Sequence, residues 1–204
     1  MWIKICGMTT AAAVAAALEA RVDAIGFVFA QSARRLSAQR AYELAAPARG
    51  RVRCVAVTRH PTQSALDEIL AAFKPDILQT DAGDLQRLRV PAAIELLPVM
   101  RAGEPLLETL PQRILFEGPV SGAGIAADWQ AARGFARRTQ VVLAGGLNSD
   151  NVAAAIAAVR PFGGDVSSGV EERIGIKSAP AITQFVMSVR VALAPAARLS
   201  GDSS

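Results

Sequence analysis

Cysteine and histidine are almost missing from this sequence. Two cysteines, Cys6 and Cys54, and one histidine, His60, occur in 204 residues. Two cysteines are poor material for a disulfide framework and fit a reducing compartment, so we expect a cytoplasmic protein. A single histidine cannot form a histidine-rich cluster, and no zinc-ligand spacing is present, so we predict no metal site.

The sequence also lacks a long uninterrupted apolar run and a strong excess of one charge sign. Lys4 interrupts the apolar stretch at the N-terminus, so we expect neither a signal segment nor a membrane span. Lysine and arginine number 22 against 18 aspartates and glutamates, a net charge of +4. This mild and mostly scattered charge favours small anionic ligands and gives little support for a nucleic-acid partner.

What the sequence does contain is a regular alternation of short apolar runs with alanine- and leucine-rich stretches of helical spacing. The expected strands are Trp2 to Cys6, Ala24 to Phe29, Val52 to Thr58, Ile77 to Thr80, Ile94 to Val99, Ile114 to Glu117, Val141 to Ala144 and Gly164 to Ser167. The expected helices include Ala11 to Ala20, Ala38 to Ala46, Ser64 to Phe73, Asp128 to Ala136 and Asp150 to Val159. Eight such βα units with no linker favour a closed (β/α)8 TIM barrel over a doubly wound open sheet.

The organisation predicts an α/β protein with a single compact domain over residues 1–195. Residues 196–204 lose the helical periodicity, so we expect a frayed tail there. The segment from Asp81 to Pro91 leaves room for only a short helix between the fourth and fifth strands.

In this architecture the active site lies at the carboxyl ends of the strands, where polar residues follow the apolar runs. Lys4 and Cys6 share one face of the first strand because strand side chains alternate. Lys4 then favours the thiolate form of Cys6, and a small buried apolar cysteine is the alternative. Cys54, inside the third strand, fits only the buried apolar interpretation.

Glu117 ends the sixth strand between apolar residues and a Gly-Pro pair. Partial dehydration there would raise its pKa and suit it to general acid catalysis, opposite the thiol of Cys6. An ion pair with one of the many arginines is the alternative.

Glycine-rich turns follow the seventh and eighth strands. Gly145 and Gly146 in the first turn, and Ser167 and Ser168 in the second, offer the backbone N–H groups and hydroxyls of a phosphate site. Gly122 and Gly124, after the sixth strand, add a third contact or form a mobile loop. Walker and dinucleotide-binding glycine patterns are missing, since the first strand is followed by GMTTA.

Six segments in order resemble a known family. They are KICGMT, DAIGFVFAQSARRLS, DILQTD, ILFEGPVSGAG, LAGGLNSDNVAAAI and GGDVSSGVEERIGIK. Together they run from Lys4 to Lys177, and the sequence resembles the phosphoribosylanthranilate isomerases of tryptophan biosynthesis. The resemblance implies a (β/α)8 barrel that catalyses an Amadori rearrangement of a sugar-phosphate substrate without a cofactor.

The resemblance also implies roles for individual residues. The family's cysteine base falls on Cys6 and its acid on Glu117, where an aspartate is usual. The arginine that grips the anthranilate carboxylate falls on Arg34, and Asp165 would hold a sugar hydroxyl or the anthranilate amine. The remaining matches are Gln79, as a substrate contact, and the phosphate-binding set Gly122, Gly124, Gly145, Gly146, Ser167 and Ser168.

Two departures from the family pattern bear on the binding geometry. Asp81 stands where the family usually has histidine, and Thr58-Arg59 replaces a further polar contact after the third strand. A related histidine-pathway isomerase uses aspartate at the position of Cys6, so Cys6 argues against it. A non-catalytic barrel that binds phosphate ligands is the alternative from a different class. The alanine-rich helix faces would look alike in a monomer and in a weak dimer, and we expect a monomer.

Overall fold

Eight parallel strands close into a barrel in the computed structural model, which describes residues 1–103, 110–118 and 127–194. The strands are β1 (Trp2–Cys6), β2 (Ala24–Val28), β3 (Arg53–Val57), β4 (Ile77–Asp81), β5 (Glu95–Arg101), β6 (Arg113–Glu117), β7 (Gln140–Leu143) and β8 (Gly163–Val166). They pair in sequence order, and β1 closes the ring against β8. The predicted TIM barrel is confirmed.

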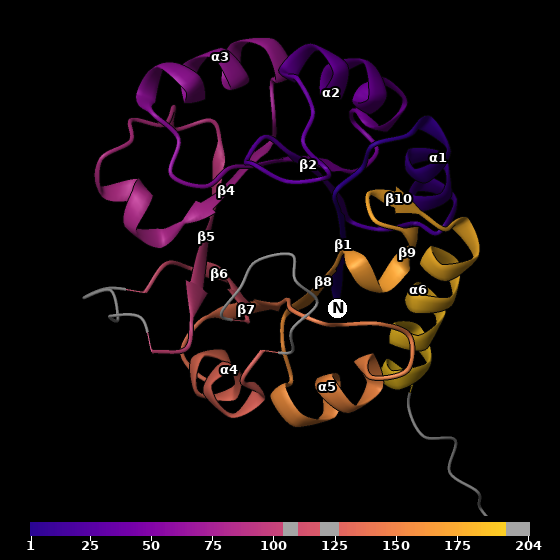
Figure 1. Ribbon diagram of the computed structural model, residues 1–204. Coiled ribbons are helices and arrows are strands. Elements are labelled where there is room, and N and C mark those ends of the chain that lie inside the picture. Colours follow the sequence, from indigo (N-terminus) through magenta and orange to yellow (C-terminus); the bar gives the residue numbers. More distant parts are fainter. Residues whose placement is uncertain (104–109, 119–126, 195–204) are drawn as a thin grey trace, which may run out of the picture.

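The helices lie around the outside of the strands, as Figure 1 shows in a view along the barrel. They are α1 (Ala11–Glu19), α2 (Ala38–Ala45), α3 (Gln63–Phe73), α4 (Trp129–Ala136), α5 (Val152–Val159) and α6 (Ala179–Leu193). The side chains of Thr10, Ser37, Thr62, Asp128 and Ser178 each accept a backbone hydrogen bond at the start of a helix. These caps explain why the helices begin where they do.

Strand alternation divides the core into two parts. Ile3 and Ile5 point outward and pack under the helices, whereas Val55, Leu115 and Val142 fill the barrel interior. On β4, β5, β6 and β8 the interior row becomes polar toward the carboxyl end of the strand, at Gln79, Arg101, Glu117 and Asp165. Apolar side chains therefore fill the barrel interior toward the amino ends of the strands, and the polar side chains lie at the carboxyl ends.

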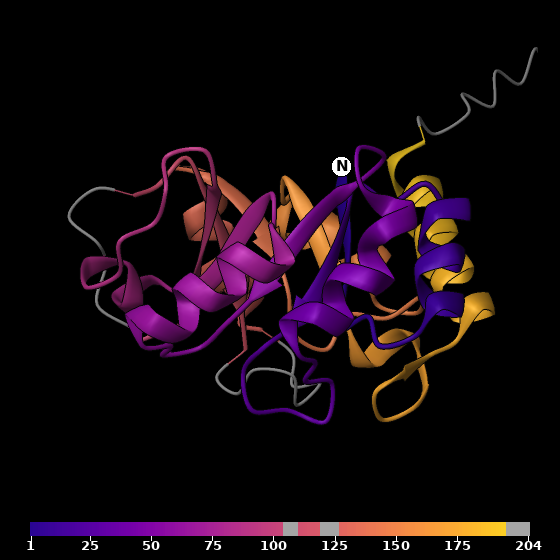
Figure 2. The ribbon, with the colours of Figure 1, turned by 90° about the horizontal axis from the view of Figure 1, so that it is seen from above.

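Most differences from the predicted elements are shifts of one or two residues at their ends. The short helix expected between β4 and β5 is the 3-10 turn Ala82–Gln86. The hairpin formed by β9 (Glu171–Arg173) and β10 (Ile176–Lys177) was not predicted. In Figure 2, which shows the barrel from the side, this hairpin projects on the side opposite the N-terminus.

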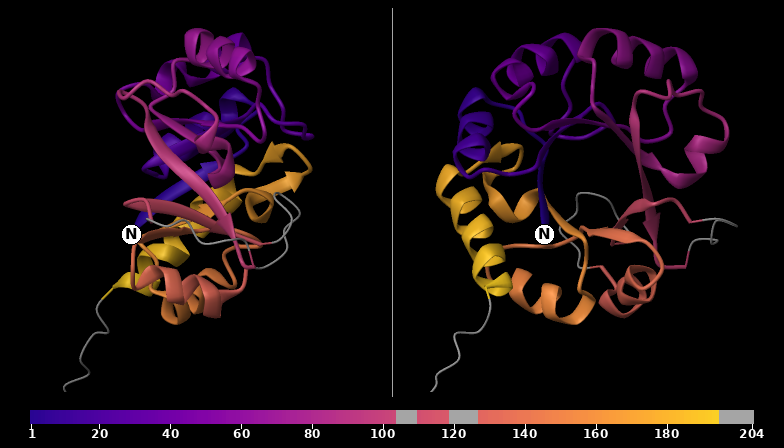
Figure 3. Two further views of the ribbon diagram at one scale, coloured as in Figure 1. Left: turned by 90° about the vertical axis from the view of Figure 1, so that its left-hand side faces the viewer. Right: turned by 180° about the vertical axis from the view of Figure 1, so that it is seen from behind.

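The left-hand view in Figure 3, from the side of the barrel, likewise shows the N-terminus and the hairpin at opposite ends. Within the described residues, every helix is too short or too polar to cross a membrane. The expected tail at 196–204 and its boundary at residue 195 lie outside the described residues, as do Gly122 and Gly124.

Candidate active site

A cavity of about 300 Å³ opens at the carboxyl ends of the barrel strands. Every candidate site residue that the structure describes lines it, namely Cys6, Arg34, Gln79, Glu117, Gly145, Gly146, Asp165, Ser167 and Ser168. A volume of this order accommodates a small organic ligand. The cavity brings together residues that are far apart in the sequence: Cys6 and Ser168 are separated by 162 positions.

Cys6 ends β1 beside two charged groups. Lys4 is fully buried inside the barrel, and its ammonium donates a 2.9 Å hydrogen bond to Asp165 Oδ1 on β8. Burial raises the pKa of the Cys6 thiol, and the Lys4 charge acts in the opposite direction. The Lys4 charge therefore acts in the expected direction on the pKa of Cys6, and burial outweighs it.

Gly26 on β2 leaves the space in which these two side chains meet. A Cβ atom at Gly26 would lie 3.1 Å from both Cys6 Sγ and Lys4 Cε. A contact of that length is tighter than ordinary van der Waals packing, so any larger residue would push the two groups aside. Glycine at this position is thus part of the Cys6 environment.

Glu117 ends β6 and is 9% exposed. Arg101, the last residue of β5, donates from Nη2 to Glu117 Oε1 at 2.6 Å and to Asp81 Oδ1 at 2.9 Å. The arginine ion pair, which was the alternative interpretation of Glu117, is what the structure contains. A guanidinium that is hydrogen-bonded to a carboxylate stabilises the charged form of that carboxylate.

Arg101 was missed by sequence analysis. The predicted fifth strand ended at Val99, and the observed strand continues to Arg101. The signal was available, because Leu97, Val99 and Arg101 alternate along one face of the strand. Extending the alternation by one step would have found a polar residue at the strand end.

The two predicted phosphate turns lie against one another. Gly145 and Gly146 after β7 have φ values of +91° and +63°, which glycine adopts without strain. A Cβ atom at Gly169 would lie 2.0 Å from the carbonyl oxygen of Leu147, so only glycine permits this approach of the two loops. Loop glycines and the hydroxyls of Ser167 and Ser168 thereby share one wall of the cavity.

Gln79 on β4 has an unused acceptor. Its side chain lines the cavity, and its buried Oε1 atom accepts no hydrogen bond from the described residues. A buried acceptor without a donor is costly, so a ligand hydroxyl or amine can supply what the protein does not.

Arg34, in the segment after β2, is held by a residue that sequence analysis did not single out. Its Nε and Nη2 donate to the two carboxylate oxygens of Glu171 at 2.7 and 2.8 Å. Burial alone would raise the pKa of Glu171, but hydrogen bonds from Arg34 and Lys177 outweigh it and lower the pKa to about 2. Glu171 is therefore ionised at neutral pH.

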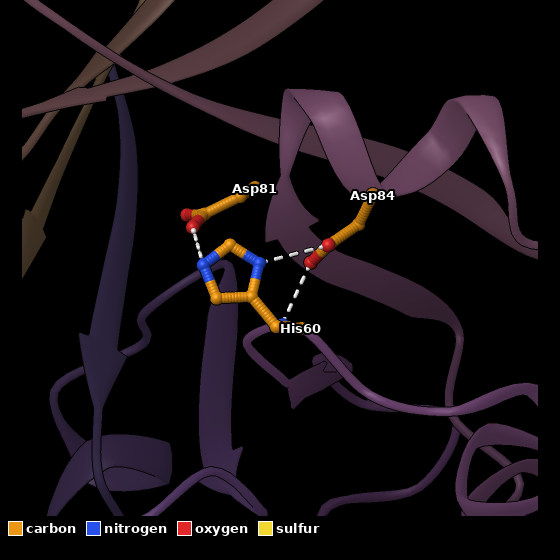
Figure 4. Close-up of side chains that lie close together, drawn as sticks. All are labelled: His60, Asp81 and Asp84. Atoms are coloured by element: carbon orange, nitrogen blue, oxygen red, sulfur yellow. Dashed lines mark hydrogen bonds and ion pairs between the residues drawn. The ribbon is translucent and has the colours of Figure 1, made fainter.

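His60 meets two carboxylates beside the cavity, as Figure 4 shows. Its Nδ1 lies 2.9 Å from Asp84 Oδ1, and its Nε2 lies 3.3 Å from Asp81 Oδ2. These three residues are close enough to hold a metal ion. Asp84 already accepts hydrogen bonds from the Thr80 hydroxyl, the His60 backbone and Arg87, so its lone pairs are occupied by protein donors. The arrangement fits a hydrogen-bonded loop anchor better than a cation site.

The remaining cysteine behaves as predicted. Cys54 is fully buried in β3 among apolar residues, and both cysteines are unpaired. Burial raises the pKa of the Cys54 thiol to about 11. Cys54 does not line the cavity, so the reactive candidate is Cys6.

Comparison with known proteins identifies the family of the chain. The family model described as "N-(5'phosphoribosyl)anthranilate (PRA) isomerase" matches residues 3–188. The curated N-(5'-phosphoribosyl)anthranilate isomerase of Rhizobium etli is 37% identical over 212 residues, which cover 95% of this chain and 96% of that protein. The one from Mesorhizobium japonicum is 38% identical over 210 residues, covering 93% and 95%.

Solved structures give the same result. The phosphoribosyl anthranilate isomerase of Thermus thermophilus superposes with a TM-score of 0.80 at 25% identity, covering 94% of this chain and 99% of that one. TrpF from Jonesia denitrificans superposes with a TM-score of 0.78 at 31% identity, covering 94% and 98%. The chain therefore belongs to the N-(5'-phosphoribosyl)anthranilate isomerase family.

Proposed function

We propose that Cys6 is the general base and Glu117 the general acid of the isomerisation that this family carries out in tryptophan biosynthesis. The reaction converts N-(5-phosphoribosyl)anthranilate into 1-(2-carboxyphenylamino)-1-deoxyribulose 5-phosphate. The observation that carries the proposal is that a thiol and a carboxyl group from strands on different sides of the barrel line one cavity. Proton removal from C2 and proton donation to the ring oxygen on the neighbouring carbon C1 require this kind of arrangement.

Each proton that is donated in the proposed reaction is matched by one that is removed. Glu117 protonates the furanose ring oxygen, the C1–O bond breaks, and the ring opens to a Schiff base with the anthranilate nitrogen. The thiolate of Cys6, which burial makes the minor form and the Lys4 charge favours, removes the proton from C2 and gives an enolamine. The enolamine then tautomerises: its hydroxyl proton passes to the Glu117 carboxylate and the Cys6 thiol returns its proton to C1, which leaves a ketone at C2 and restores both groups. Substrate and product are isomers, so the step needs no oxidant or reductant.

Arg101 allows Glu117 to become protonated without leaving a buried charge unpaired. The guanidinium bridges Glu117 and Asp81, both within 2.9 Å of the same Nη2 atom. When Glu117 takes up a proton, Asp81 continues to neutralise Arg101. Since an unpaired buried guanidinium is strongly unfavourable, this second carboxylate makes the acid form of Glu117 accessible.

The two ends of the substrate match the two sides of the cavity. We infer that the substrate phosphate lies against Gly145, Gly146, Ser167 and Ser168, whose backbone N–H groups and the Ser168 hydroxyl can donate to it. We infer further that the anthranilate carboxylate binds Arg34. Gln79 and Asp165 remain for the sugar hydroxyls and the amine between these ends. Gly122 and Gly124 are assigned to the phosphate side by resemblance alone, since they lie outside the described residues.

A turnover assay with freshly generated phosphoribosylanthranilate tests the acid and the base. We expect Cys6→Ala and Glu117→Gln each to lower kcat by about 10²- to 10⁴-fold while binding of the reduced product is retained. Cys54→Ala is the matched control, because Cys54 is a buried thiol that does not line the cavity. Turnover that survives either site substitution would contradict the assignment. A folded wild-type protein that binds phosphate ligands without turnover would favour the binding-barrel alternative.

We propose that the chain is a monomer in the cytoplasm. Large exposed apolar side chains within the described residues are few, and Met187, Val191 and Leu193 on α6 form the main group. The Thermotoga maritima protein is described as dimeric, although at 23% identity it shares only the fold. Light scattering after gel filtration measures the mass against 21.3 kDa for one chain. A mass of two chains would contradict the proposal.

A further inference from the structure

The guanidinium of Arg34 is fixed along one of its two hydrogen-bonding edges. Nε and Nη2 face Glu171 in two parallel bonds of 2.7 and 2.8 Å, and the side chains are 11% and 5% exposed. A guanidinium carries five N–H donors, and this side-on pair uses two of them. Arg34 makes no other side-chain hydrogen bond within the described residues, so the edge formed by Nη1 and Nη2 is available to a ligand carboxylate.

Glu171 is itself fixed from the other side. Lys177 Nζ is fully buried and donates to Glu171 Oε1 at 2.8 Å and to the backbone oxygen and hydroxyl of Ser167 at 2.9 and 3.2 Å. Glu171 and Lys177 belong to the two strands of the β9–β10 hairpin. Ser167 in turn donates from Oγ to the carbonyl oxygen of Cys6 at 3.0 Å. A continuous chain of hydrogen bonds thus joins Arg34 to the backbone of Cys6.

Glu171 supports the cavity without reaching it. Arg34 and Ser167 line the cavity, whereas Glu171 and Lys177 do not. Gly7, with a φ of +82°, allows the Arg34 side chain to cross directly behind Cys6, since a Cβ there would lie 2.6 Å from Arg34 Cδ. Arg34 and Lys177 are cationic and Glu171 is anionic, so this cluster carries a net charge of +1 beside the cavity. A positive charge there favours an anionic ligand.

We propose that Glu171, braced by Lys177, is a positioning residue that sets the orientation of Arg34 and thereby determines recognition of a carboxylate on the aromatic end of the substrate. The inference rests on the proposed function of Arg34. Glu171 acts only through Arg34, because it has no access to the ligand. The hairpin that carries it is accordingly a specificity element of the barrel.

Two inhibitors separate carboxylate recognition from the rest of binding. One is the product reduced at its ketone, and the other is the same molecule with a phenylamino group, which lacks the carboxylate. In Glu171→Gln we expect the inhibition constant of the first to rise about tenfold, since small misplacements of a positioned group have large effects. The constant of the second stays within about twofold, and KM rises more than kcat falls.

Glu172→Gln is the matched control, because Glu172 is the exposed neighbour on the same strand and makes no ion pair within the described residues. Glu171→Asp is a second variant that keeps a negative charge beside Lys177 while shortening the side chain by one methylene. It remains informative if Glu171→Gln does not fold. It is expected to lose part of the discrimination between the two inhibitors at near wild-type stability, and full discrimination in a folded Glu171→Asp protein overturns the proposal.

Combining these variants with Arg34→Ala distinguishes the two ways in which the idea fails. If Arg34→Ala abolishes discrimination, the Glu171 variants should add nothing further in that background, because both changes act on one contact. If Arg34→Ala abolishes discrimination but Glu171→Gln retains it, the positioning role is wrong and the function of Arg34 stands. If Arg34→Ala retains discrimination, the proposed function of Arg34 is wrong, and the positioning role falls with it.

Discussion

Arg101 donates a 2.6 Å hydrogen bond to Glu117 at the mouth of the barrel. This contact decides how the proposed acid works, because a guanidinium at that distance favours the carboxylate over the acid form. Asp81 shares the same Nη2 atom at 2.9 Å and competes for the charge of Arg101. We therefore expect the acid strength of Glu117 to depend on Asp81, a residue of a different strand.

Replacing Asp81 tests that dependence. In Asp81→Asn the competing charge disappears, Arg101 stabilises the Glu117 carboxylate more strongly, and less of the acid form is present at neutral pH. We expect the alkaline limb of the pH–kcat profile to move to lower pH and kcat at pH 7.5 to fall about tenfold. A profile that coincides with the wild type would show that Asp81 has no influence on the proton donor.

The surroundings of Cys6 make a second prediction. Lys4 opposes the effect of burial on the Cys6 thiol, so Lys4→Met should raise the pKa of Cys6 further. The rate of alkylation of Cys6 at pH 8 is then expected to fall about tenfold, measured by mass spectrometry of the Cys6 peptide. Cys54 serves as an internal control in the same sample, because it lies outside the cavity. Equal alkylation rates in the two proteins would contradict a role for Lys4.

Lys4→Met also removes the partner of a buried carboxylate. Asp165 is 7% exposed and pairs with Lys4 at 2.9 Å. Breaking such a pair leaves one uncompensated buried charge, and the cost is about 3 to 5 kcal/mol. The alkylation measurement is therefore made at a temperature where circular dichroism shows both proteins folded.

Replacement by alanine is expected to change the stability of the protein in opposite directions at two glycines, Gly169 and Gly134. Gly169→Ala would place a Cβ 2.0 Å from a backbone oxygen of Leu147, so the phosphate loops must separate. We expect a lower Tm and a KM raised at least tenfold. Gly134 lies exposed inside α4 with nothing within 4 Å of its Cβ position, so Gly134→Ala should stabilise the protein by about 0.5 to 1 kcal/mol. Thermal melts of the two variants side by side check both signs.

The sequence allowed most of the fold to be predicted because its signals are periodic. Eight apolar runs recur along the chain with helical stretches between most of them, and an error of one residue at an end does not change the number of strands. Site residues on strands were found for the same reason, since alternation puts Lys4 and Cys6 on one face and ends β6 at Glu117. Arg34 follows a predicted strand and Asp165 lies in one, and the resemblance to the family added their roles.

What escaped prediction depends on pairing between distant segments. Arg101 was missed because the predicted strand stopped two residues short of it, at Val99. Glu171 and Lys177 were missed because a hairpin of three and two residues has no periodicity to detect. Their importance comes from contacts with Arg34 and Ser167, which no local pattern encodes. The Arg101 partner of Glu117 was likewise one among many arginines in the sequence.

The Arg34–Glu171–Lys177 cluster finally predicts how stability depends on pH. The pKa of Glu171 falls from 4.5 to about 2 on folding, because its bonds to Arg34 and Lys177 outweigh the effect of burial. A group whose pKa is lowered in the folded state stabilises that state above its unfolded pKa. This contribution, on the order of 2 to 3 kcal/mol, is lost as pH falls from about 4.5 toward 2. Chemical unfolding at pH 6, 4 and 3 should therefore show a steeper loss of stability in the wild type than in Glu171→Gln, with Glu172→Gln following the wild type. Parallel curves for the wild type and Glu171→Gln would mean that the cluster does not hold a carboxylate in its charged form.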